Sequence, residues 1–440
     1  MKTKICIILA VIILSFRNEF LARETVFQPI DTSGKIYSPE SWNEIDSIHL
    51  YHDESEALIM DLATEKGLNL SYDLSSYHIF NGQAVPLVVI TTEEELEQIP
   101  DKINYKKANI EIKGFGVYDD FSNEVSIRGR GNSSWTLSDK KPYRLKFDKK
   151  VSLCGLNKAK SFVLTANWTD ESLMQNSIAS FIGKMFNIPY THTYIPVDVI
   201  LNGVYRGSYL LTNKPGINAG SVDIDEDNSV MWELDINFDE DLKFISDTFE
   251  MPVMLADPDL DETHFELWKE DYNEMEKGVN EGRASEYIDL DEYVRYRMIY
   301  YLFRVNDIGF PKSLKLYKTK GGKYNFGPIW DFDVAMGFNW DDRYSLYLAS
   351  SYFWESALMV AIDKDPMVQE LIRKYLVEFF ERENEVWDFI DDYANTIELS
   401  ALRNNIAWSY KNEDWQESVS KMKLWLQHRF QFIKEKYEIQ

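Results

Sequence analysis

The sequence predicts an α+β protein with a β-rich N-terminal half and a mostly helical C-terminal half. Short runs of alternating apolar and polar residues, typical of half-buried strands, recur between residues 85 and 235. Beyond residue 289 the apolar residues recur mainly at helical spacing, as far as Tyr437. No repeat, low-complexity tract or flexible linker divides these segments. We therefore expect one bilobal unit, with a β-rich lobe at about 85–235 and a helical lobe at about 289–440.

The N-terminal residues predict a secretory signal. Lys2 and Lys4 precede an apolar run, 5–16, that is too short for a membrane-spanning helix. Cleavage after Ala22 gives a mature chain without a transmembrane span, secreted or held at the cell surface or in the periplasm; an uncleaved anchor is the alternative. We thus expect a signal at 1–22, an N-terminal extension at 23–84 and the main domain at 85–440. Only Cys154 then remains, which excludes an intrachain disulfide.

Composition narrows the class of partner. A chain of 440 residues with 45% hydrophobic content can bury a large core. Its formal net charge of −26 argues against nucleic acid, whose phosphates attract Lys and Arg. Basic residues nevertheless concentrate between Arg128 and Lys160, where only Asp139 and Asp148 oppose them. This stretch is either an anion-attracting site or an exposed basic hairpin.

The elements can be predicted in order along the chain. A strand at 85–90 is followed by a helix that begins at Thr91, because Glu94 stands in capping-box position. The turn Asn202-Gly203 joins two strands as a hairpin, and Pro366 is placed to start a helix within the C-terminal helical block, 356–437. The remaining elements are strands at 108–113, 124–127, 143–147, 162–165, 197–201 and 207–211 and a helix at 172–185.

Two acidic clusters flank a predicted hairpin. Asn306-Asp307 closes an amphipathic run, and Asp331 follows Asp307 by 24 residues. Between them, 313–318 and 323–327 alternate like strands around Gly321-Gly322. The hairpin should bring both clusters to one edge, where they can supply a base and magnesium ligands for phosphoryl transfer. Otherwise Asp307 is a turn residue at a helix end.

The Asp331-Phe332-Asp333 segment carries two carboxylates. The alternation of a strand would place both on one face, where they repel each other. A divalent cation resolves this conflict, and a structural pair of arginines is the alternative.

A glycine-containing loop precedes the basic strand at 143–147. Its backbone amides can turn toward an anion, and lysines of the following strand can reach phosphates from the sheet. Such a lysine commonly needs a carboxylate to hold it, and Glu233 on another predicted strand is available. The candidate nucleotide-binding residues are Arg128, Gly129, Arg130, Gly131, Asn132, Ser133, Lys141, Lys146 and Glu233.

Five blocks of this sequence, in this order, resemble the CotH kinase family of spore coat proteins, which are secreted relatives of protein kinases. The resemblance covers roughly residues 86–345, and the combination is specific although each block alone is not. The blocks are Arg128-Gly-Arg-Gly-Asn-Ser-Ser-Trp135, Lys141-Pro-Tyr-Arg-Leu-Lys-Phe147, Phe162-Val-Leu-Thr-Ala-Asn-Trp-Thr-Asp170, Leu201-Asn-Gly-Val-Tyr-Arg-Gly-Ser-Tyr-Leu-Leu211 and Phe326-Gly-Pro-Ile-Trp-Asp-Phe-Asp333.

The resemblance implies an atypical protein-kinase-like fold that phosphorylates protein substrates with ATP and Mg²⁺ or Mn²⁺. Asp307 then resembles the catalytic aspartate and Asp331 the metal-binding aspartate of the kinase Asp-Phe-Gly element. Asp333 replaces its glycine, which puts the conformational switch of that element in doubt and adds a possible second metal ligand. Asn306 is a candidate metal ligand, although it precedes Asp307, whereas the kinase asparagine follows the catalytic aspartate.

The phosphate contacts that the resemblance implies are less definite. Lys146 is the first choice for the phosphate-pairing lysine and Lys141 the second, while Arg128 or Arg130 can contact phosphate directly or form an ion pair. Asn167 and Asp170 take part in the nucleotide site or cap the helix that follows.

Three functions are compatible with these residues. The first is a secreted, metal-dependent kinase that acts on Ser or Thr. The second is a non-catalytic kinase-like scaffold or surface binding module, and the third is a nucleotidyl transferase on the same fold.

Overall fold

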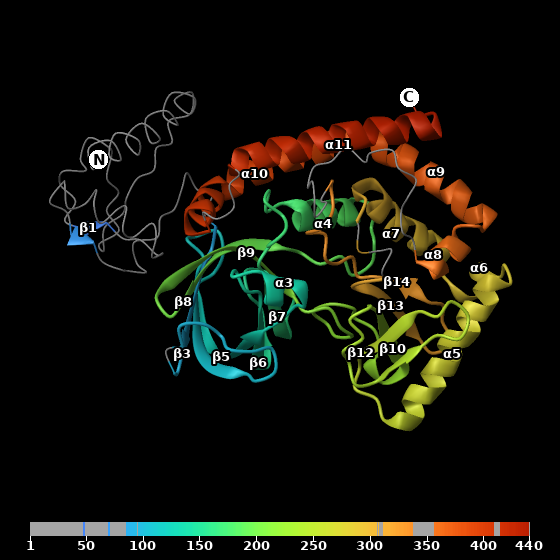
Figure 1. Ribbon diagram of the computed structural model, residues 1–440, viewed down its shortest axis with the longest axis horizontal. Helices are drawn as coiled ribbons and strands as arrows, with labels where there is room; N and C mark the ends of the chain where they lie inside the picture. The colour runs from blue at the N-terminus through green and yellow to red at the C-terminus, as the bar shows by residue number, and fades with distance from the viewer. Residues whose placement is uncertain are drawn as a thin grey trace. The chain divides into compact units, whose positions relative to one another are not determined.

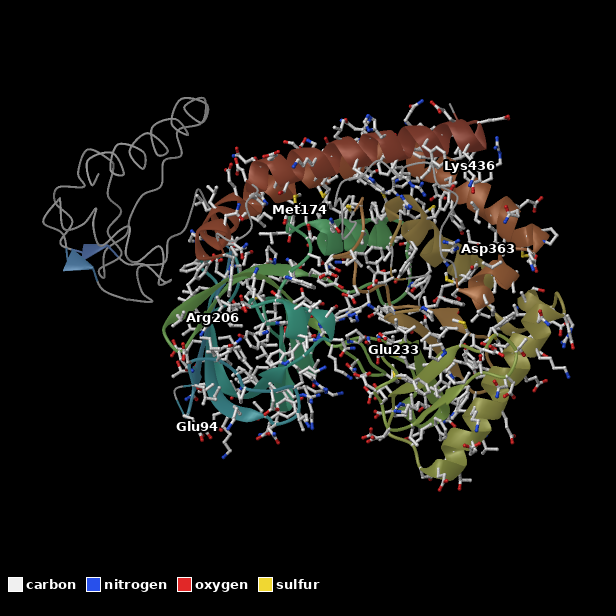
Figure 2. The ribbon with its side chains drawn as sticks, viewed as in Figure 1. Glu94, Met174, Arg206, Glu233, Asp363 and Lys436 are labelled. Carbon is white, nitrogen blue, oxygen red and sulfur yellow. The ribbon has the colours of Figure 1, made fainter. Side chains whose placement is uncertain are left out.

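The computed structural model describes residues 47–48, 69–70, 85–94, 96–305, 307, 311–337, 356–408 and 414–439. Figure 1 shows the ribbon and Figure 2 the side chains. The predicted signal at 1–22 and most of the predicted extension at 23–84 lie outside the described residues; within 23–84 the structure describes the parallel pair β1 (Ser47–Ile48) and β2 (Asn69–Leu70). No helix of the described part is long and apolar enough to cross a membrane.

The predicted α+β class is confirmed. A β-rich N-terminal region contains strands of a closed barrel, and the C-terminal part is mostly helical. The chain divides into two compact units, which are described separately here: unit 1 comprises 1–129, 196–209 and 396–412, and unit 2 comprises 130–195, 210–395 and 413–440.

Unit 1 is built on strands of two kinds: β4 (Lys106–Lys113) alternates buried with more exposed side chains, whereas β3 (Leu87–Thr92) and β8 (Ile195–Leu201) are buried at nearly every residue. β3, β4 and β5 (Phe121–Gly129) form an antiparallel meander, and β8 pairs parallel with β3. The turn Asn202-Gly203 leads into β9 (Val204–Asn213), and both turn residues have positive φ, as a tight hairpin requires.

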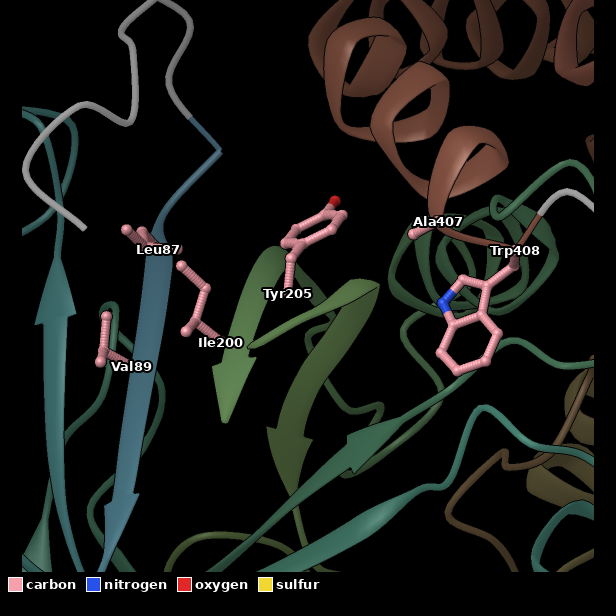
Figure 3. Packing of buried hydrophobic residues seen from close by; sticks show 6 residues of the cluster. All are labelled: Leu87, Val89, Ile200, Tyr205, Ala407 and Trp408. Atoms are coloured by element: carbon pink, nitrogen blue, oxygen red, sulfur yellow. The ribbon is translucent and has the colours of Figure 1, made fainter. Parts of the chain in front are cut away.

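The core of unit 1 joins strand residues to the end of a helix from the C-terminal region. Figure 3 shows this cluster, in which side chains of β3, β8 and β9 pack with Ala407 and Trp408. The Trp408 indole also donates a hydrogen bond of 3.1 Å to the carbonyl oxygen of Arg206. The buried members are Leu87, Val89, Ile200, Tyr205, Ala407 and Trp408.

Unit 2 begins with the short helix α3 (Ser133–Leu137) and a β-hairpin. β6 (Tyr143–Val151) pairs antiparallel with β7 (Ala159–Thr165), and β7 pairs with the second half of β9. Helix α4 (Gln175–Met185) follows, three residues later than the predicted start at 172. Asp170 accepts hydrogen bonds from the backbone N–H groups of Leu173 and Gln175, so this residue caps the turn that leads into α4.

A five-stranded sheet lies in the middle of unit 2, in the order β11-β12-β10-β13-β14. Its strands are β10 (Ser229–Leu234), β11 (Lys243–Ile245), β12 (Pro252–Asp257), β13 (Leu314–Thr319) and β14 (Asn325–Phe326). The predicted Gly321-Gly322 hairpin between β13 and β14 is present, with Gly321 at φ +78°. Helix α5 (Glu262–Asn280) runs alongside this sheet (Figure 1), and the Trp232 ring contacts Phe265 and Tyr272 of α5 at centroid distances of 5.9 and 6.1 Å.

The helical part of unit 2 packs around one buried helix, α7. Most side chains of α7 are buried, and this helix contacts α4, α9 and α11. Phe379 of α9 and Phe430 of α11 meet edge to face at 5.1 Å. The helices are α6 (Ala284–Tyr287), α7 (Leu290–Phe303), α8 (Ala357–Ile362), α9 (Pro366–Glu381), α11 (Trp415–Tyr437) and the first part of α10 (Glu383–Ala407), whose residues from 396 onward belong to unit 1.

Two local predictions are wrong. The helix predicted from Thr91 is absent from the described residues, because β3 continues to Thr92 and turns and bends follow it. The strand predicted through Asp331 and Asp333 is also absent: this segment is irregular, and Asp331 has a φ of +67°. The argument from strand alternation therefore does not hold for these two carboxylates.

Candidate functional site

Asp307 lies just after the C-terminus of α7. Arg304, in the left-handed conformation, ends that helix, and the carbonyl oxygen of Asp307 accepts a hydrogen bond of 3.1 Å from Lys312 N–H. Burial raises the pKa of the Asp307 carboxyl to about 6, and the nearby Asp331 carboxylate acts in the same direction. A carboxylate with a pKa near neutrality, beside a second acid, is suited to accept a proton.

Asp331 and Asp333 are held by hydrogen bonds from three directions. The Ser313 hydroxyl donates to Asp331 Oδ2 at 2.9 Å, and the Thr169 hydroxyl donates to the carbonyl oxygen of Asp333 at 2.6 Å. Between the two acids, Phe332 N–H donates to the Asn176 side chain of α4 at 2.9 Å. The pKa of Asp333 is raised well above its usual range by burial and by the charge of Asp331.

The side chain of Phe332 anchors the same segment to α7. Its ring lies 4.9 Å from the Tyr300 ring and 6.2 Å from the Phe303 ring. On either side of Phe332, the Tyr300 hydroxyl donates to the carbonyl oxygen of Trp330 at 3.4 Å, and Ala335 N–H donates to the Gln175 side chain at 3.3 Å. The acidic segment is thus fixed to both α4 and α7.

Asp235 is a further acid of this site, and the sequence analysis did not single it out. It is buried after β10 and accepts hydrogen bonds from Asn237 N–H at 2.8 Å and from Ser313 N–H at 3.2 Å. Ser313 therefore links Asp235 to Asp331. Burial raises the pKa of Asp235, and the charge of Asp235 in turn raises the pKa of Asp307.

The chemistry of these acids suits a divalent cation, but their arrangement in the described structure does not form a complete metal site. Carboxylate oxygens are the ligands that Mg²⁺ and Mn²⁺ prefer, and burial together with the charge of Asp331 disfavours ionisation of Asp333, a cost that a bound cation would offset. Within the described part of the chain, however, no three His, Cys, Asp or Glu side chains are arranged to hold a metal. Asn306, the other predicted ligand, lies outside the described residues.

Glu233 forms an ion pair with Lys315, which the sequence did not indicate as its partner. Glu233 of β10 lies opposite Lys315 of β13 in the sheet register, and the two side chains bond to each other (Glu233 is labelled in Figure 2). Lys315 is buried. Sequence reasoning instead paired Glu233 with Lys146 or Lys141; it had identified the strand that carries Lys315 but could not know its register against β10.

Lys214, at the end of β9, is a second cation that the sequence analysis missed. Its ammonium group has no hydrogen bond or ion pair with any described residue. Burial lowers the pKa of Lys214, and the positive charge of Arg144 lowers it further. Lys315 and Glu233 also act on this pKa, so Lys214 lies beside the ion pair. A single lysine after a strand carries no local signal that would have identified it.

The glycine-containing loop uses several of its own polar groups internally. In unit 1, Gly129 N–H donates to the carbonyl oxygen of Asp101 at 2.9 Å. The Arg128 guanidinium bonds to the carbonyl oxygen of Lys102 and lies 5.0 Å from the centre of the Tyr105 ring. These contacts give Arg128 a structural role, and its role in nucleotide binding stays a prediction.

The part of the loop in unit 2 places Arg130 close to the acids. Its guanidinium lies 5.6 Å from the centre of the ring of Trp330, the residue that precedes Asp331 in the sequence. The guanidinium makes no ion pair with any described carboxylate. Gly131 has φ +80°, and a Cβ there would lie 2.3 Å from Ser134 Oγ. The Asn132 carbonyl oxygen accepts from Trp135 N–H at 3.2 Å at the start of α3, whose first residue is the exposed Ser133.

The two lysines predicted to pair phosphates have other surroundings. The Lys141 ammonium group donates a hydrogen bond of 2.6 Å to the carbonyl oxygen of Trp135 and lies 5.4 Å from the centre of the Trp135 ring. Lys146 is exposed on β6. Lys214 and Lys315 are the lysines that lie near Glu233.

Asn167, between β7 and α4, is buried with φ +48°, and neither polar atom of its side chain has a hydrogen-bond partner. A buried amide without partners is costly, so this residue is available to a ligand. Asp170 close by serves as the helix cap described above.

We compared the chain with models of known protein families. A family model described as CotH kinase protein matches residues 127–433, which is well over half of the chain. No curated protein matches the chain.

Proposed function

The chain belongs to the CotH kinase protein family, which implies an atypical kinase activity with ATP, and from this premise we propose that it is a secreted, metal-dependent protein kinase. The proposed reaction transfers the γ-phosphate of ATP to a Ser or Thr hydroxyl of an extracytoplasmic or surface protein. In this reaction the acceptor oxygen forms a bond to the γ-phosphorus, the bond to the β-phosphate oxygen breaks, and ADP leaves.

The observation that carries this proposal is the position of the Asp307 carboxyl beside a second acid, Asp331. Burial and the charge of Asp331 raise the pKa of Asp307 to about 6. At neutral pH this carboxylate is ionised and can accept the proton that the acceptor hydroxyl loses. Asp307 is therefore the proposed base.

The cations near Glu233 support a phosphate subsite. Lys315 is held by Glu233 across two strands, as the phosphate-pairing lysine of a kinase is held by a glutamate. Lys214 adds an ammonium group that lacks a partner among the described residues, and an anion would supply one. We assign the phosphate contacts to Lys315 and Lys214 rather than to Lys146.

Asp331 and Asp333 would hold the divalent cation, which neutralises the charge of the phosphates when bound. The raised pKa of Asp333 supports this assignment, because burial and the charge of Asp331 disfavour the ionised carboxylate and a bound cation would favour it. Arg130, near Asp331, would face the same phosphates.

One observation favours the non-catalytic alternative. The described residues contain no preformed set of three metal-ligating side chains, and a kinase-like scaffold would need none. The nucleotidyl transferase alternative keeps the same nucleotide site but attacks the α-phosphorus, so the position of a label in ATP separates it from the kinase.

The test uses the protein from about residue 23 onward with γ-labelled or α-labelled ATP, Mg²⁺ or Mn²⁺, and an acidic protein acceptor. Asp307→Asn and Asp331→Asn should lose transfer of the γ-label, whereas Asp391→Asn, an exposed change on α10, should retain it. Transfer of the α-label would establish nucleotidyl transfer instead. No label in protein, together with no thermal shift by ATP and metal, would favour the non-catalytic scaffold instead.

A further inference from the structure

The β6–β7 hairpin of unit 2 carries an unusual excess of positive charge for this chain. Between residues 143 and 165 the only acid is Asp148, whereas the whole protein has a formal net charge of −26. The exposed lysines of the hairpin are Lys146, Lys149 and Lys150 on β6, Lys158 in the loop and Lys160 on β7.

Four of these lysines have no counter-ion. Lys149, Lys150, Lys158 and Lys160 make no ion pair or hydrogen bond through their ammonium groups with any residue that the structure describes. A chain with 73 acidic residues could readily have placed carboxylates beside them. Like charges that gather without compensation repel one another, and they attract an anionic partner from solution.

The basic residues continue from the hairpin toward the candidate site. Arg144 and Lys146 stand two residues apart on β6, so their side chains leave the strand on the same face. Arg144 in turn lies beside Lys214, on whose pKa its charge acts. The hairpin thus leads from an exposed basic surface to the proposed phosphate subsite.

The geometry fits an extended acidic peptide. Val151 of β6 pairs with Ala159 of β7, which brings Lys149 and Lys150 next to Lys158 and Lys160 at one end of the hairpin, within reach of a few residues of an extended chain. Single-stranded nucleic acid would need exposed aromatic rings to stack on, and the hairpin aromatics Tyr143, Phe147 and Phe162 are all buried. The remaining surface of this acidic chain would also repel a long polyanion.

We propose that Lys149, Lys150, Lys158 and Lys160 form a docking surface for an acidic segment of the protein acceptor. The inference rests on the proposed kinase function, because the docked segment would deliver a nearby Ser or Thr to the site. The lysines would contribute to acceptor affinity and not to the chemical step.

The test compares two variants of the full chain with equal changes in charge. The docking variant carries Lys149→Gln, Lys150→Gln, Lys158→Gln and Lys160→Gln. The control variant carries the same change at four exposed lysines elsewhere in unit 2, namely Lys277, Lys320, Lys364 and Lys374. All eight side chains are exposed, so both variants should unfold at the temperature of the unmodified protein.

The first readout is binding of a fluorescent peptide with six consecutive glutamates, which does not depend on catalysis. The docking variant should bind at least about tenfold more weakly at low salt, and the control variant within about twofold of the unmodified protein. Raising the salt should reduce this difference, because the contacts are exposed. With a labelled acidic acceptor, KM should rise in the docking variant while kcat and the KM of a neutral peptide stay unchanged.

Equal weakening in both variants would overturn the proposal, since total charge would then be the cause. Lysine-dependent binding of an oligonucleotide, polyphosphate or anionic vesicle, without binding of the glutamate peptide, would also overturn it. If the peptide binds through these lysines but no acceptor receives the γ-phosphate, the docking surface stands and the kinase function fails.

Discussion

Glu233 and Lys315 lie directly opposite each other on the antiparallel strands β10 and β13, and their side chains form an ion pair. In protein kinases the glutamate that holds the phosphate-pairing lysine stands on a helix that can move. Here both residues belong to one sheet, where cross-strand neighbours are held at a fixed separation by the backbone. The pair is therefore part of the sheet and does not depend on the position of a helix.

Replacing Lys315 should abolish phosphoryl transfer and also destabilise the protein. Lys315→Met leaves Glu233 without its partner in a largely buried position, which commonly costs about 3 kcal/mol or more. The double variant Glu233→Gln, Lys315→Met should recover most of the free energy of unfolding but no activity. Urea unfolding and γ-phosphate transfer measure the two effects, and activity in the double variant would exclude Lys315 from phosphate binding.

The rate should depend on pH through Asp307. Because the pKa of this carboxyl is raised to about 6, the base becomes protonated as pH falls through that value. We expect kcat/KM to fall about tenfold per unit below it and to level off above it. Bound metal would move the inflection to lower pH. Asp307→Asn should remove activity by about 10²-fold or more at all pH values.

Stability gives an independent check on Asp307. Asp307→Asn should not lower the free energy of unfolding at pH 8, because the ionised carboxylate is disfavoured by burial and by Asp331. For the rate, a kcat/KM of the unmodified enzyme that stays constant from pH 5 to 8 would contradict the assignment of Asp307 as the base.

Divalent metal should stabilise the protein through Asp331 and Asp333. The pKa of Asp333 is raised well above its usual range, so metal binding must displace a proton and should tighten as pH rises. Millimolar Mg²⁺ or Mn²⁺ should raise the unfolding temperature by a few degrees. Asp331→Asn should lose this shift, and a shift that persists in that variant would place the metal elsewhere.

Glu292 should make the protein less stable at alkaline pH. This buried residue of α7 accepts a hydrogen bond of 2.5 Å from the Tyr317 hydroxyl, and burial raises the pKa of Glu292 to about 7. Its contribution to stability is therefore complete below the unfolded pKa, near 4.5, and is lost as pH rises through about 7.

Glu292→Gln keeps the acceptor for Tyr317 and removes the charge. This variant should exceed the unmodified protein in free energy of unfolding by roughly 1–3 kcal/mol at pH 8, and the difference should vanish at pH 5. Glu270→Gln on the exposed face of α5 serves as the control and should change little at either pH. Urea unfolding at both pH values measures these differences. If Glu292→Gln and Glu270→Gln gave the same unfolding curves at pH 8, the prediction would be rejected.

The sequence predicted elements whose signals are local. The Asn202-Gly203 and Gly321-Gly322 turns need positive φ, which only a few residue types adopt readily, and Pro366 starts α9 as expected. The helix expected at Thr91 failed because pairing extends β3 through Thr92, so a tertiary contact overrode a capping pattern. Helix α5 and strands β11 and β12 were not predicted.

Features that depend on register or burial could not be predicted. The residue opposite Glu233 is set by how β10 aligns with β13, and one sequence does not give that alignment. Lys214 stands out only because it is half-buried beside the Glu233–Lys315 ion pair, without a partner for its ammonium group in the described structure. Asp331 and Asp333 were expected on a strand, whereas the positive φ of Asp331 and its bond to Ser313 hold them in an irregular segment.

The anchoring of the Asp331-Phe332-Asp333 segment bears on how such an enzyme could be controlled. Reversing this segment would break the hydrogen bond from Phe332 N–H to Asn176 and remove the Phe332 ring from Tyr300 and Phe303 of α7. Because turning the segment over would lose these contacts, we expect an inactive form of that kind to be rarely populated. We expect a constitutively competent catalyst, whose output is governed by how much of it is made and by the supply of nucleotide at its location.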